Sequence, residues 1–327
     1  MIFESDSMKT IQDIKKMAVI GAGVMGHGIA EIYALNGFTV SIMDVKKEIL
    51  EKGMTQIESE LKTLIANKFV TEQESFDALN RISISTNLED AVDGCNFVTE
   101  AVIENLELKK KVFAELEKYA CEDSILASNT SGIMISKIAE GLKRPENVIG
   151  THFAVPPHIV PGVEIIRGKE TSDSTFQISY ELMKKIGKLP FVAKKDDDGF
   201  VLNRLQLALA REAFYLVENE IATPEDIDVC LNSTIGFRWF TIGPFKQMDS
   251  AGVDSWANVG SYLFASLSNS KKVPKAITDK VAKGELGMKS GKGFYDYTKL
   301  KMEDVISERD NGFLKTLELM EALKNRA

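Results

Sequence analysis

Short apolar runs alternate with longer amphipathic stretches from Lys16 to about Lys188. Runs of about four to eight residues have the length of buried strands, and the stretches between them suit helices that cover a sheet. This alternation is typical of α/β folds with parallel strands. Strands are predicted at residues 17–20, 38–43, 81–85, 97–102, 125–128, 148–151, 163–166 and 190–193.

Two helical regions are predicted among the first three strands, one between the first and second strands and one between the second and third. Residues 24–36 predict a helix that ends at Gly37, because glycine accepts the left-handed backbone that closes many helices. Residues 46–80 are highly charged, and their apolar positions recur every three or four residues, which places them on one helical face. We therefore expect a pair of helices inserted into the α/β region. The apolar positions are Ile57, Leu61, Leu64, Ile65 and Phe69.

The pattern changes near residue 194, where strand signals stop. We predict an α/β domain over residues 1–194 and an all-helical domain over residues 195–327. Residues 200–220 form a helical segment that is apolar on nearly every side, so this helix should be buried, with a second subunit as one candidate partner. A last amphipathic stretch, residues 303–324, should pack against its own domain or a partner chain.

A glycine-rich turn, Gly21-x-Gly23-x-x-Gly26, lies between the first predicted strand and the first predicted helix. In this context the spacing is typical of dinucleotide binding: the first glycine allows the tight turn, the second lets pyrophosphate approach, and the third lets helix and strand pack closely. The free N–H groups at the helix start then face the phosphates. A ligand-free turn or the loop of an S-adenosylmethionine methyltransferase remains an alternative.

Asp44 ends the second predicted strand, where a carboxylate can accept hydrogen bonds from ribose hydroxyls and repel a 2′-phosphate. This position favours NAD over NADP, although Lys46 and Lys47 directly beyond it leave NADP open. The alternative role for Asp44 is to cap the helix that follows.

His152 and Glu164 occupy strand-like segments twelve positions apart. His152 follows a strand end, where ligands bind in open α/β sheets, and imidazole can exchange a proton with an alcohol near neutral pH. Glu164 interrupts an apolar pattern, and a carboxylate there needs a partner. Orienting His152 is the more economical role, and pairing with Arg167 is the alternative.

Two further polar positions accompany this pair. Ser131 closes the run Ser128-Asn129-Thr130-Ser131 and can offer a hydroxyl to a substrate oxygen; the alternative is that the run caps the helix predicted at residues 133–139. Asn203 lies at the apolar start of a predicted helix. Its side-chain amide either binds the substrate or forms a hydrogen bond within the core. A hydroxyl, an imidazole and a carboxylate placed at strand ends predict a secondary-alcohol dehydrogenase.

The net charge, the cysteine spacing and the apolar runs indicate which partners and which cellular compartment to expect. The formal net charge of −8 disfavours sequence-independent binding to nucleic acid or anionic membrane. Cys95, Cys121 and Cys230 are far apart and lack C-x-x-C spacing, so we expect no disulfide framework and no metal site. The N-terminal residues show no signal-peptide pattern and no apolar run has membrane-spanning length, so we expect a cytoplasmic protein.

With these motifs in place, the chain resembles the L-3-hydroxyacyl-CoA dehydrogenase family over nearly its whole length. Many elements match in order, which is very specific for this superfamily. They are the glycine loop, residues 100–105, the run 128–131, His152 with Glu164, and residues 199–204, 243–245 and 291–297.

The resemblance implies a Rossmann-type, mostly parallel sheet domain followed by an all-α dimerisation domain, hence a homodimer. It implies a catalytic pair of His152 and Glu164, with Ser131 and Asn203 on the substrate oxygen. It also implies NAD as the cofactor. The implied cofactor contacts are Gly21, Gly23, Val24, Met25, Gly26, Asp44, Glu104, Lys109 and Ser131.

The chain departs from the family near the predicted chemistry. Val155 stands where the family usually has the asparagine of His-Phe-Phe-Asn-Pro, which removes a polar contact near the nicotinamide. Residues 156–158 and 308–310 look more like branches that act on L-carnitine, L-gulonate or other CoA-free hydroxy acids. Ser59 and Lys68 lie in the helical pair that meets coenzyme A in the acyl-CoA enzymes; a solvated helix face explains them equally well.

The sequence therefore predicts NAD-dependent oxidation of a 3-hydroxyacyl-CoA of the 3-hydroxybutyryl-CoA type, or the reverse reduction. A dehydrogenase of a small CoA-free 3-hydroxy acid is the alternative within enzymes. An NAD-binding protein with a structural or sensing role, as in the lens-crystallin branch, is the alternative outside them.

Overall fold

The computed structural model describes residues 10–324, and these residues divide into two compact units. One unit contains the residues up to Asn203 together with those from Ile306 onward, and the other is Arg204–Val305. The sequence placed the boundary between residues 194 and 195. The structure instead groups residues 195–203 and the C-terminal helix with the sheet-bearing unit. The Val201 amide donates to Glu164 of the sheet, and Asn311 of the C-terminal helix accepts a hydrogen bond from Asn67.

An eight-stranded sheet with the order β3-β2-β1-β4-β5-β6-β7-β8 forms the centre of the first unit. All eight predicted strands are present, with ends shifted by two residues at most. Neighbouring strands run parallel except β6 and β7, which form an antiparallel pair; the sequence pattern did not predict this reversal. The strands are β1 (Lys16–Ile20), β2 (Thr39–Met43), β3 (Ile82–Ser85), β4 (Phe97–Glu100), β5 (Ile125–Ser128), β6 (Val148–Phe153), β7 (Gly162–Ile166) and β8 (Leu189–Ala193).

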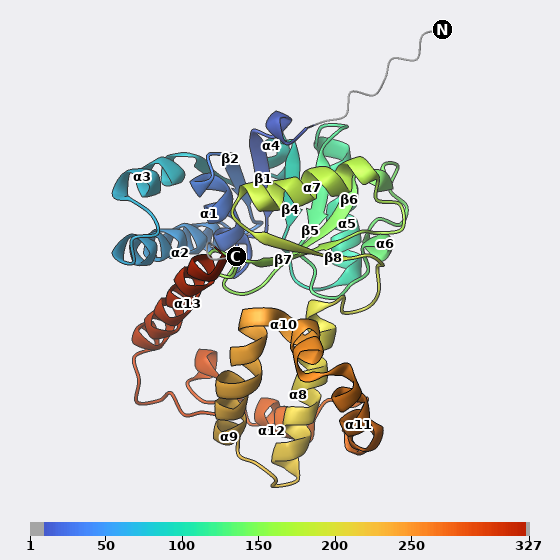
Figure 1. Ribbon diagram of the computed structural model, residues 1–327. Helices are drawn as coiled ribbons and strands as arrows, with labels where there is room; N and C mark the ends of the chain where they lie inside the picture. The colour runs from blue at the N-terminus through green and yellow to red at the C-terminus, as the bar shows by residue number, and fades with distance from the viewer. Residues whose placement is uncertain (1–9, 325–327) are drawn as a thin grey trace. The chain divides into compact units, whose positions relative to one another are not determined.

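Helices cover both faces of this sheet (Figure 1). Apolar residues of α1, α2, α3 and α7 share one buried cluster with one face, and those of α5 and α6 share a second cluster with the other. The strands are apolar along their length because both faces are buried, as expected for a largely parallel sheet. The helices are α1 (Gly26–Leu35), α2 (Lys47–Ala66), α3 (Glu72–Asn80), α4 (Leu88–Val92), α5 (Leu106–Tyr119), α6 (Ile135–Ile138) and α7 (Asp173–Lys185).

The inserted helical pair is α2 and α3, and its predicted apolar face is the one that packs inward. Ile57, Leu61 and Leu64 are buried in α2. Thr71 starts α3 with a capping box, accepting a hydrogen bond from the Glu74 amide. Buried residues therefore fix the helical pair against the first unit. Another part of α2 faces the C-terminal helix.

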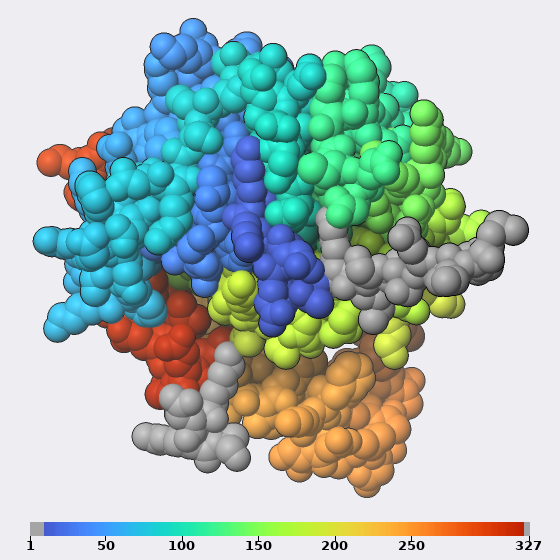
Figure 2. All heavy atoms as spheres, turned by 90° about the horizontal axis from the view of Figure 1, so that it is seen from above, coloured from blue at the N-terminus to red at the C-terminus, as the bar shows by residue number. Residues whose placement is uncertain are grey.

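That C-terminal helix, α13 (Met302–Lys324), packs against the first unit from Ile306 onward. Leu314 is buried in a cluster with Leu64 and Ile159, and the amide of Asn67 donates to Asn311 Oδ1 at 2.8 Å. Figures 1 and 2 show α13, in red, beside α2 and α3. The sequence left open whether this helix covers its own domain or a partner; the structure places it on the sheet-bearing unit.

The second unit is helical, and its helices expose much apolar surface. The prediction that the segment 200–220 is buried is wrong for the single chain: α8 (Leu202–Glu218) contains no buried residue, and Leu205 and Leu207 are each 67% exposed. The other helices of at least seven residues are α9 (Pro224–Cys230), α10 (Gly236–Ala251), α11 (Val253–Leu263) and α12 (Lys275–Ala282). Among the described residues, no helix has the length and apolarity needed to cross a membrane.

Candidate active site

The glycine loop joins β1 to α1 in the geometry of a dinucleotide cradle. Gly21 has a φ of 104°, and a Cβ there would lie 2.7 Å from the carbonyl oxygen of Ala101. A Cβ on Gly26 would lie 1.7 Å from the Gly21 carbonyl, so only glycine permits this turn. A Cβ on Gly23 would meet nothing within 4 Å, which leaves the backbone open to an approaching phosphate.

Asp44 follows β2 and supports this loop directly. Its Oδ2 accepts a hydrogen bond from the Ala22 amide at 3.1 Å, and its Oδ1 accepts one from the Lys46 amide at 3.3 Å. Helix α2 begins with Lys46 as its N-cap, so Asp44 does not take the capping position that was its alternative role. Its carboxylate thus lies beside the glycine loop, where the ribose of a dinucleotide is expected.

His152 and Glu164 face each other across the antiparallel β6–β7 pair. They are direct register partners, and His152 Nδ1 lies 3.2 Å from Glu164 Oε2. His152 is 5% exposed and Glu164 is fully buried. Arg167, the alternative partner, pairs instead with Asp173 at 2.7 Å. The antiparallel reversal of β7 is what brings these two side chains together.

The other oxygen of Glu164 holds the segment that leads into α8. Glu164 Oε1 accepts hydrogen bonds from the amides of Val201 at 2.6 Å and Leu202 at 3.4 Å. One turn further, the Asn203 side chain donates to the Ser131 carbonyl oxygen at 2.5 Å. The structure therefore brings Ser131 and Asn203 together, through a backbone carbonyl. Glu164 links this segment to His152.

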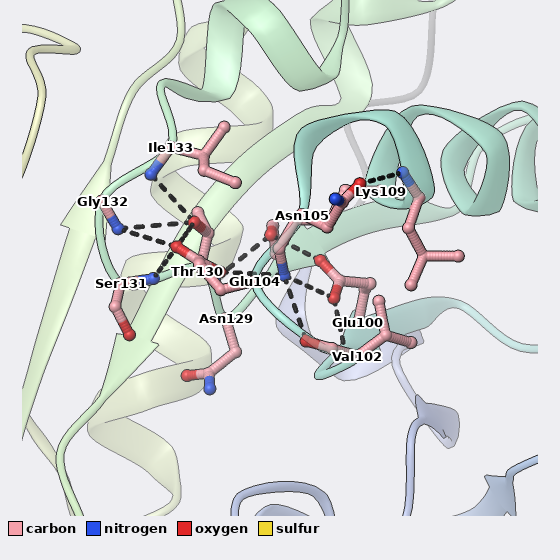
Figure 3. A network of polar contacts seen from close by, with 12 residues as sticks. Glu100, Val102, Glu104, Asn105, Lys109, Asn129, Thr130, Ser131, Gly132 and Ile133 are labelled. Carbon is pink, nitrogen blue, oxygen red and sulfur yellow. Dashed lines mark hydrogen bonds and ion pairs between the residues drawn. The ribbon is translucent and has the colours of Figure 1, made fainter. Parts of the chain in front are cut away.

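Glu104 organises the loop after β5 (Figure 3). Its Oε1 accepts hydrogen bonds from Thr130 Oγ1 at 2.6 Å, the Ser131 amide at 3.0 Å and the Gly132 amide at 3.1 Å. Burial alone raises the pKa of Glu104, but the Thr130 hydrogen bond and the charge of Lys109 outweigh it and lower this pKa. An ionised Glu104 thus fixes the backbone that carries Ser131.

Lys109 lies beneath Glu104 and is fully buried. Its ammonium donates to Glu100 Oε1 at 2.7 Å and lies 3.4 Å from Glu104 Oε2. Glu100 in turn accepts a hydrogen bond from Ser128 Oγ at 2.6 Å. No surface of Lys109 is exposed, and its ion pairs support the loop from beneath; the cofactor contact that the resemblance implied stays a prediction.

The run 128–131 does not cap the next helix, which was its alternative role. Helix α6 is capped by Asp196, whose carboxylate accepts hydrogen bonds from the amides of Ile135 at 2.9 Å and Ser136 at 2.6 Å. Asn129 instead joins the ends of two strands, since its Oδ1 accepts from the Phe153 amide at 2.8 Å. The run is thereby held next to the strand that carries His152.

A cavity of about 390 Å³ adjoins the glycine loop within the first unit. Ala22, Gly23 and Val24 line one side, α2 and residues 155–157 line others, and α13 closes it with Ile306, Arg309 and Asp310. Its volume falls within the range of small-molecule sites, roughly 300–1,000 Å³.

The α2 residues on this cavity are not the ones the sequence predicted. Lys52, Gln56 and Glu60 line it, whereas Ser59 and Lys68 are exposed and belong to no described cavity lining. Lys68 instead ends the C-terminal turn of α2 with a φ of 63°. A solvated helix face, the alternative explanation, therefore accounts better for Ser59 and Lys68.

Comparison with known proteins agrees with this geometry. The profile of the 3-hydroxyacyl-CoA dehydrogenase NAD binding domain matches residues 16–197, and that of the C-terminal domain of the same family matches residues 199–297. The chain belongs to the 3-hydroxyacyl-CoA dehydrogenase family. Members of this family are NAD-dependent oxidoreductases that act on hydroxyl groups, and this chain is such an enzyme.

Two kinds of relative within the family resemble the chain. It is 39% identical over 285 residues to a 3-hydroxybutyryl-CoA dehydrogenase of Bradyrhizobium diazoefficiens, covering 87% of this chain and 96% of that one. It is 35% identical over 308 residues to a 5-formyl-3-hydroxy-2-methylpyridine 4-carboxylate 5-dehydrogenase of Mesorhizobium japonicum, covering 94% and 99%.

The solved structures that resemble the chain are of the same two kinds. A crystal structure of a 5-formyl-3-hydroxy-2-methylpyridine 4-carboxylic acid 5-dehydrogenase, an NAD⁺-dependent dismutase, has a TM-score of 0.87 at 35% identity and covers 94% of this chain and 99% of its own. The (S)-3-hydroxybutyryl-CoA dehydrogenase of Ralstonia eutropha has a TM-score of 0.71 at 36% identity, covering 87% and 99%.

NAD, the cofactor of this family, fits the residues that line the glycine loop. The backbone at Gly23 is open, Asp44 lies beside the loop, and Glu104 orders the loop that carries Ser131. Val24 is 68% exposed at the loop surface and lines the cavity, whereas Met25 is half-buried as the N-cap of α1. The five positions of the glycine loop thus serve different purposes, and Gly21 and Gly26 shape the turn.

Sequence reasoning missed three supporting residues. Glu100, Thr130 and Asp196 hold the active-site loops, and each lies far in sequence from at least one group that it bonds. The available signal was a buried carboxylate at the end of β4, since an acidic residue in an apolar strand needs a partner. Nothing in the local pattern indicated which partner.

Proposed function

We propose that this enzyme oxidises the hydroxyl carbon of a 3-hydroxyacyl substrate, or reduces the corresponding 3-oxo group, with His152 as the general base or acid. The observation that carries the proposal is the buried pair of His152 Nδ1 and Glu164 Oε2 at 3.2 Å. NAD, held at the glycine loop and Asp44, would supply the hydride chemistry. The protein residues supply the proton transfer and the orientation.

The pair fixes which imidazole nitrogen reacts. With Nδ1–H donating to the Glu164 carboxylate, the lone pair of His152 is on Nε2, and that nitrogen takes the hydroxyl proton. Glu164 then stabilises the imidazolium that forms, as carboxylates do beside catalytic histidines in other enzymes. Because Glu164 also holds the Val201 amide, its carboxylate cannot rotate freely away from the ring.

Ser131 and Asn203 are the proposed contacts of the reacting oxygen. Asn203 is fixed to the loop of Ser131 by its bond to the Ser131 carbonyl. Glu104 holds the Ser131 amide from the other side. This double fixation supports a preorganised hydroxyl and amide at the substrate, an arrangement that lowers the cost of orientation.

We propose a CoA thioester of the 3-hydroxybutyryl type as the first substrate to test, in line with the acyl-CoA relatives. A CoA-free carboxylate is the second candidate, and one observation favours it. Helix α13, which lies beyond the matched C-terminal family profile, lines the cavity beside the glycine loop and Val155. The relative that covers 94% of the chain acts, by its name, on a pyridine carboxylate.

The experiment compares both substrate classes at equal enzyme concentration. NADH oxidation is followed with acetoacetyl-CoA, and NAD reduction with 3-hydroxybutyrate, L-carnitine, L-gulonate and 5-formyl-3-hydroxy-2-methylpyridine 4-carboxylate. We expect turnover with the CoA thioester to be the fastest. Turnover confined to a free acid selects the second candidate, and no turnover with any of them contradicts the proposal.

We further propose that the enzyme is a homodimer formed through the second unit. Its helices expose large apolar side chains, among them Leu205 at 67%, Phe237 at 70% and Phe245 at 79%. Apolar surface on this scale marks an interaction site in a water-soluble protein. Light scattering should give twice the chain mass of 36.2 kDa, and a mass equal to one chain at micromolar concentration contradicts the dimer.

A further inference from the structure

A second group of ionisable side chains is buried in the first unit, separate from the His152–Glu164 pair. We propose that Glu31, Glu60 and His158 form a binding site for a divalent cation, with Zn²⁺ as the ion that suits them. One ligand atom from each residue lies within 4.8 Å of the others. The inference is independent of the substrate and concerns an ion that holds three segments of the fold together.

The three residues come from three different segments. Glu31 lies on α1, Glu60 lies on α2, and His158 lies in the connection between β6 and β7. No local motif joins them, which is why the sequence predicted no metal site. A cation here would tie the inserted helical pair to the helix of the glycine loop and to the loop that follows His152.

Several polar atoms in this group are buried without a hydrogen-bond partner. They are both carboxylate oxygens of Glu31, Oε2 of Glu60 and Nδ1 of His158. Glu31 is 0% exposed. An unpaired buried carboxylate costs several kcal/mol, and proteins keep one only where a partner or a metal compensates it. One such atom from each of the three residues lies within 4.8 Å of the other two, an arrangement that indicates a missing positive partner.

The spacing of these atoms suits zinc ligands better than a hydrogen bond. His158 Nδ1 and Glu60 Oε2 are 3.4 Å apart, yet their geometry forms no hydrogen bond. Two ligands of a tetrahedral Zn²⁺, each about 2.0–2.1 Å from the metal, lie roughly 3.4 Å from each other. The two lone pairs can therefore point at a common ion without any large movement.

The cationic side chains nearby are already bonded to other groups. Lys188 donates to the carbonyl oxygens of Pro157 at 2.6 Å and Val160 at 2.8 Å, and it forms no described ion pair with Glu31. His27 lies 3.1 Å from Glu60 Oε1, which leaves Oε2 of that carboxylate for another partner. Among the described residues neither side chain donates a hydrogen bond to Glu31, although Lys188 is close enough for its charge to lower the pKa of that carboxyl.

His27 lies between the glycine loop and Glu60. Its Nδ1 bonds to the Gly23 carbonyl at 2.7 Å while its Nε2 faces Glu60. Burial lowers the pKa of His27, but the hydrogen bond and charge of Glu60 outweigh this and raise it. Burial likewise raises the pKa of Glu60, and the hydrogen bond from His27 with the charges of His158 and His27 lowers it to about 2. Glu60 is thus ionised at neutral pH and can bind a metal.

The donor set selects the ion by its chemistry. Zn²⁺ is bound in proteins by histidine nitrogen and by carboxylate oxygen, the two donor types present here, whereas Mg²⁺ and Ca²⁺ prefer oxygen ligands alone. The competing occupant is a proton. Burial and the charge of Glu60 raise the pKa of Glu31 well above its usual value, so a proton neutralises Glu31 wherever no cation binds.

The test measures zinc binding by the purified full-length protein. The protein is stripped with a chelator, titrated with ZnCl₂ alone, passed through a desalting column and analysed for bound metal. We expect one equivalent of zinc per chain and a melting temperature that rises with zinc. Substituting Co²⁺ should give the visible absorption bands of a tetrahedral ion.

Three variants decide where the zinc binds. Glu31→Gln and His158→Asn should each lower the zinc affinity by more than about 100-fold, since loss of a ligand exceeds the effect of losing its outer support. Glu58→Gln, on the exposed face of α2, is the matched control and should bind like the unmodified protein. Glutamine keeps the size of Glu31 and is uncharged, like the protonated carboxyl of the metal-free protein, so we expect Glu31→Gln to fold and to melt no lower than the metal-free parent.

Two results would overturn the proposal. One is retention of far less than one equivalent of zinc by the unmodified protein. The other is equal zinc affinity in Glu31→Gln and Glu58→Gln. In either case a proton shared between Glu31 and Glu60 accounts for the buried carboxylates. Catalytic turnover is measured separately, so failure here leaves the proposed dehydrogenase reaction untouched.

Discussion

Replacing His152 by alanine should lower kcat by about 10²–10⁴-fold, the usual contribution of a positioned general acid or base. The dissociation constant for NADH should change little, because the cofactor residues lie on the glycine loop and Asp44 and not on the imidazole. Steady-state kinetics measures the first effect, and NADH fluorescence titration measures the second. Loss of both together would point to a disrupted sheet in place of a missing base.

Two companion variants make this result specific. Glu164→Gln keeps the size of the side chain and an oxygen for the Val201 amide, but its NH₂ group favours the wrong tautomer of His152. We expect a loss of kcat in the same range. Thr151→Val is the control on the same strand, since Thr151 is buried with an unpartnered hydroxyl. It should leave kcat unchanged; near-normal turnover in His152→Ala or Glu164→Gln would refute the proton relay.

Lys109→Met should destabilise the enzyme by about 3–5 kcal/mol, the cost of breaking a buried ion pair by removing one partner. Lys109 and Glu100 are both fully buried, with 2.7 Å between ammonium and carboxylate. Methionine fills a similar volume but leaves Glu100 charged without its counter-ion. Urea unfolding followed by circular dichroism measures the change in the free energy of unfolding.

The double variant Glu100→Gln with Lys109→Met separates charge from packing. It removes both charges, so most of the stability should return. Lys111→Met, an exposed position on the same helix, is the matched control and should lie within about 0.5 kcal/mol of the parent. If Lys109→Met and Lys111→Met unfold at the same urea concentration, the buried ion pair has no part in holding the active-site loop.

The local parts of this enzyme follow from local physics. The glycine turn, the eight strands and the inserted helices were predicted because apolar periodicity and glycine spacing act over short stretches of chain. A local cause also explains the break at Gly243, where a φ of 73°, which glycine readily adopts, interrupts α10 before Pro244. In each case the residue type restricts its own backbone.

The partners of buried polar groups could not be predicted in this way. The sequence favoured His152 as the partner of Glu164 and kept Arg167 as the alternative, and the antiparallel register of β6 and β7 decided which of them Glu164 contacts. Lys109 was predicted from the resemblance as a cofactor contact, and its ion pair with Glu100 became known only from the fold. A carboxylate in an apolar stretch of sequence indicates that it has a partner in the fold. Only the packing of distant strands identifies which residue that partner is.

The sequence by itself therefore determined the α/β framework, the dinucleotide loop and the residues able to carry the chemistry. The tertiary structure decided which of them meet, where α13 packs, and that α8 remains exposed in a single chain. It also gathered Glu31, Glu60 and His158 from three segments. The physical reason is range: backbone preference and periodicity act within a few residues, whereas burial and pairing depend on groups that the chain brings together only when it folds.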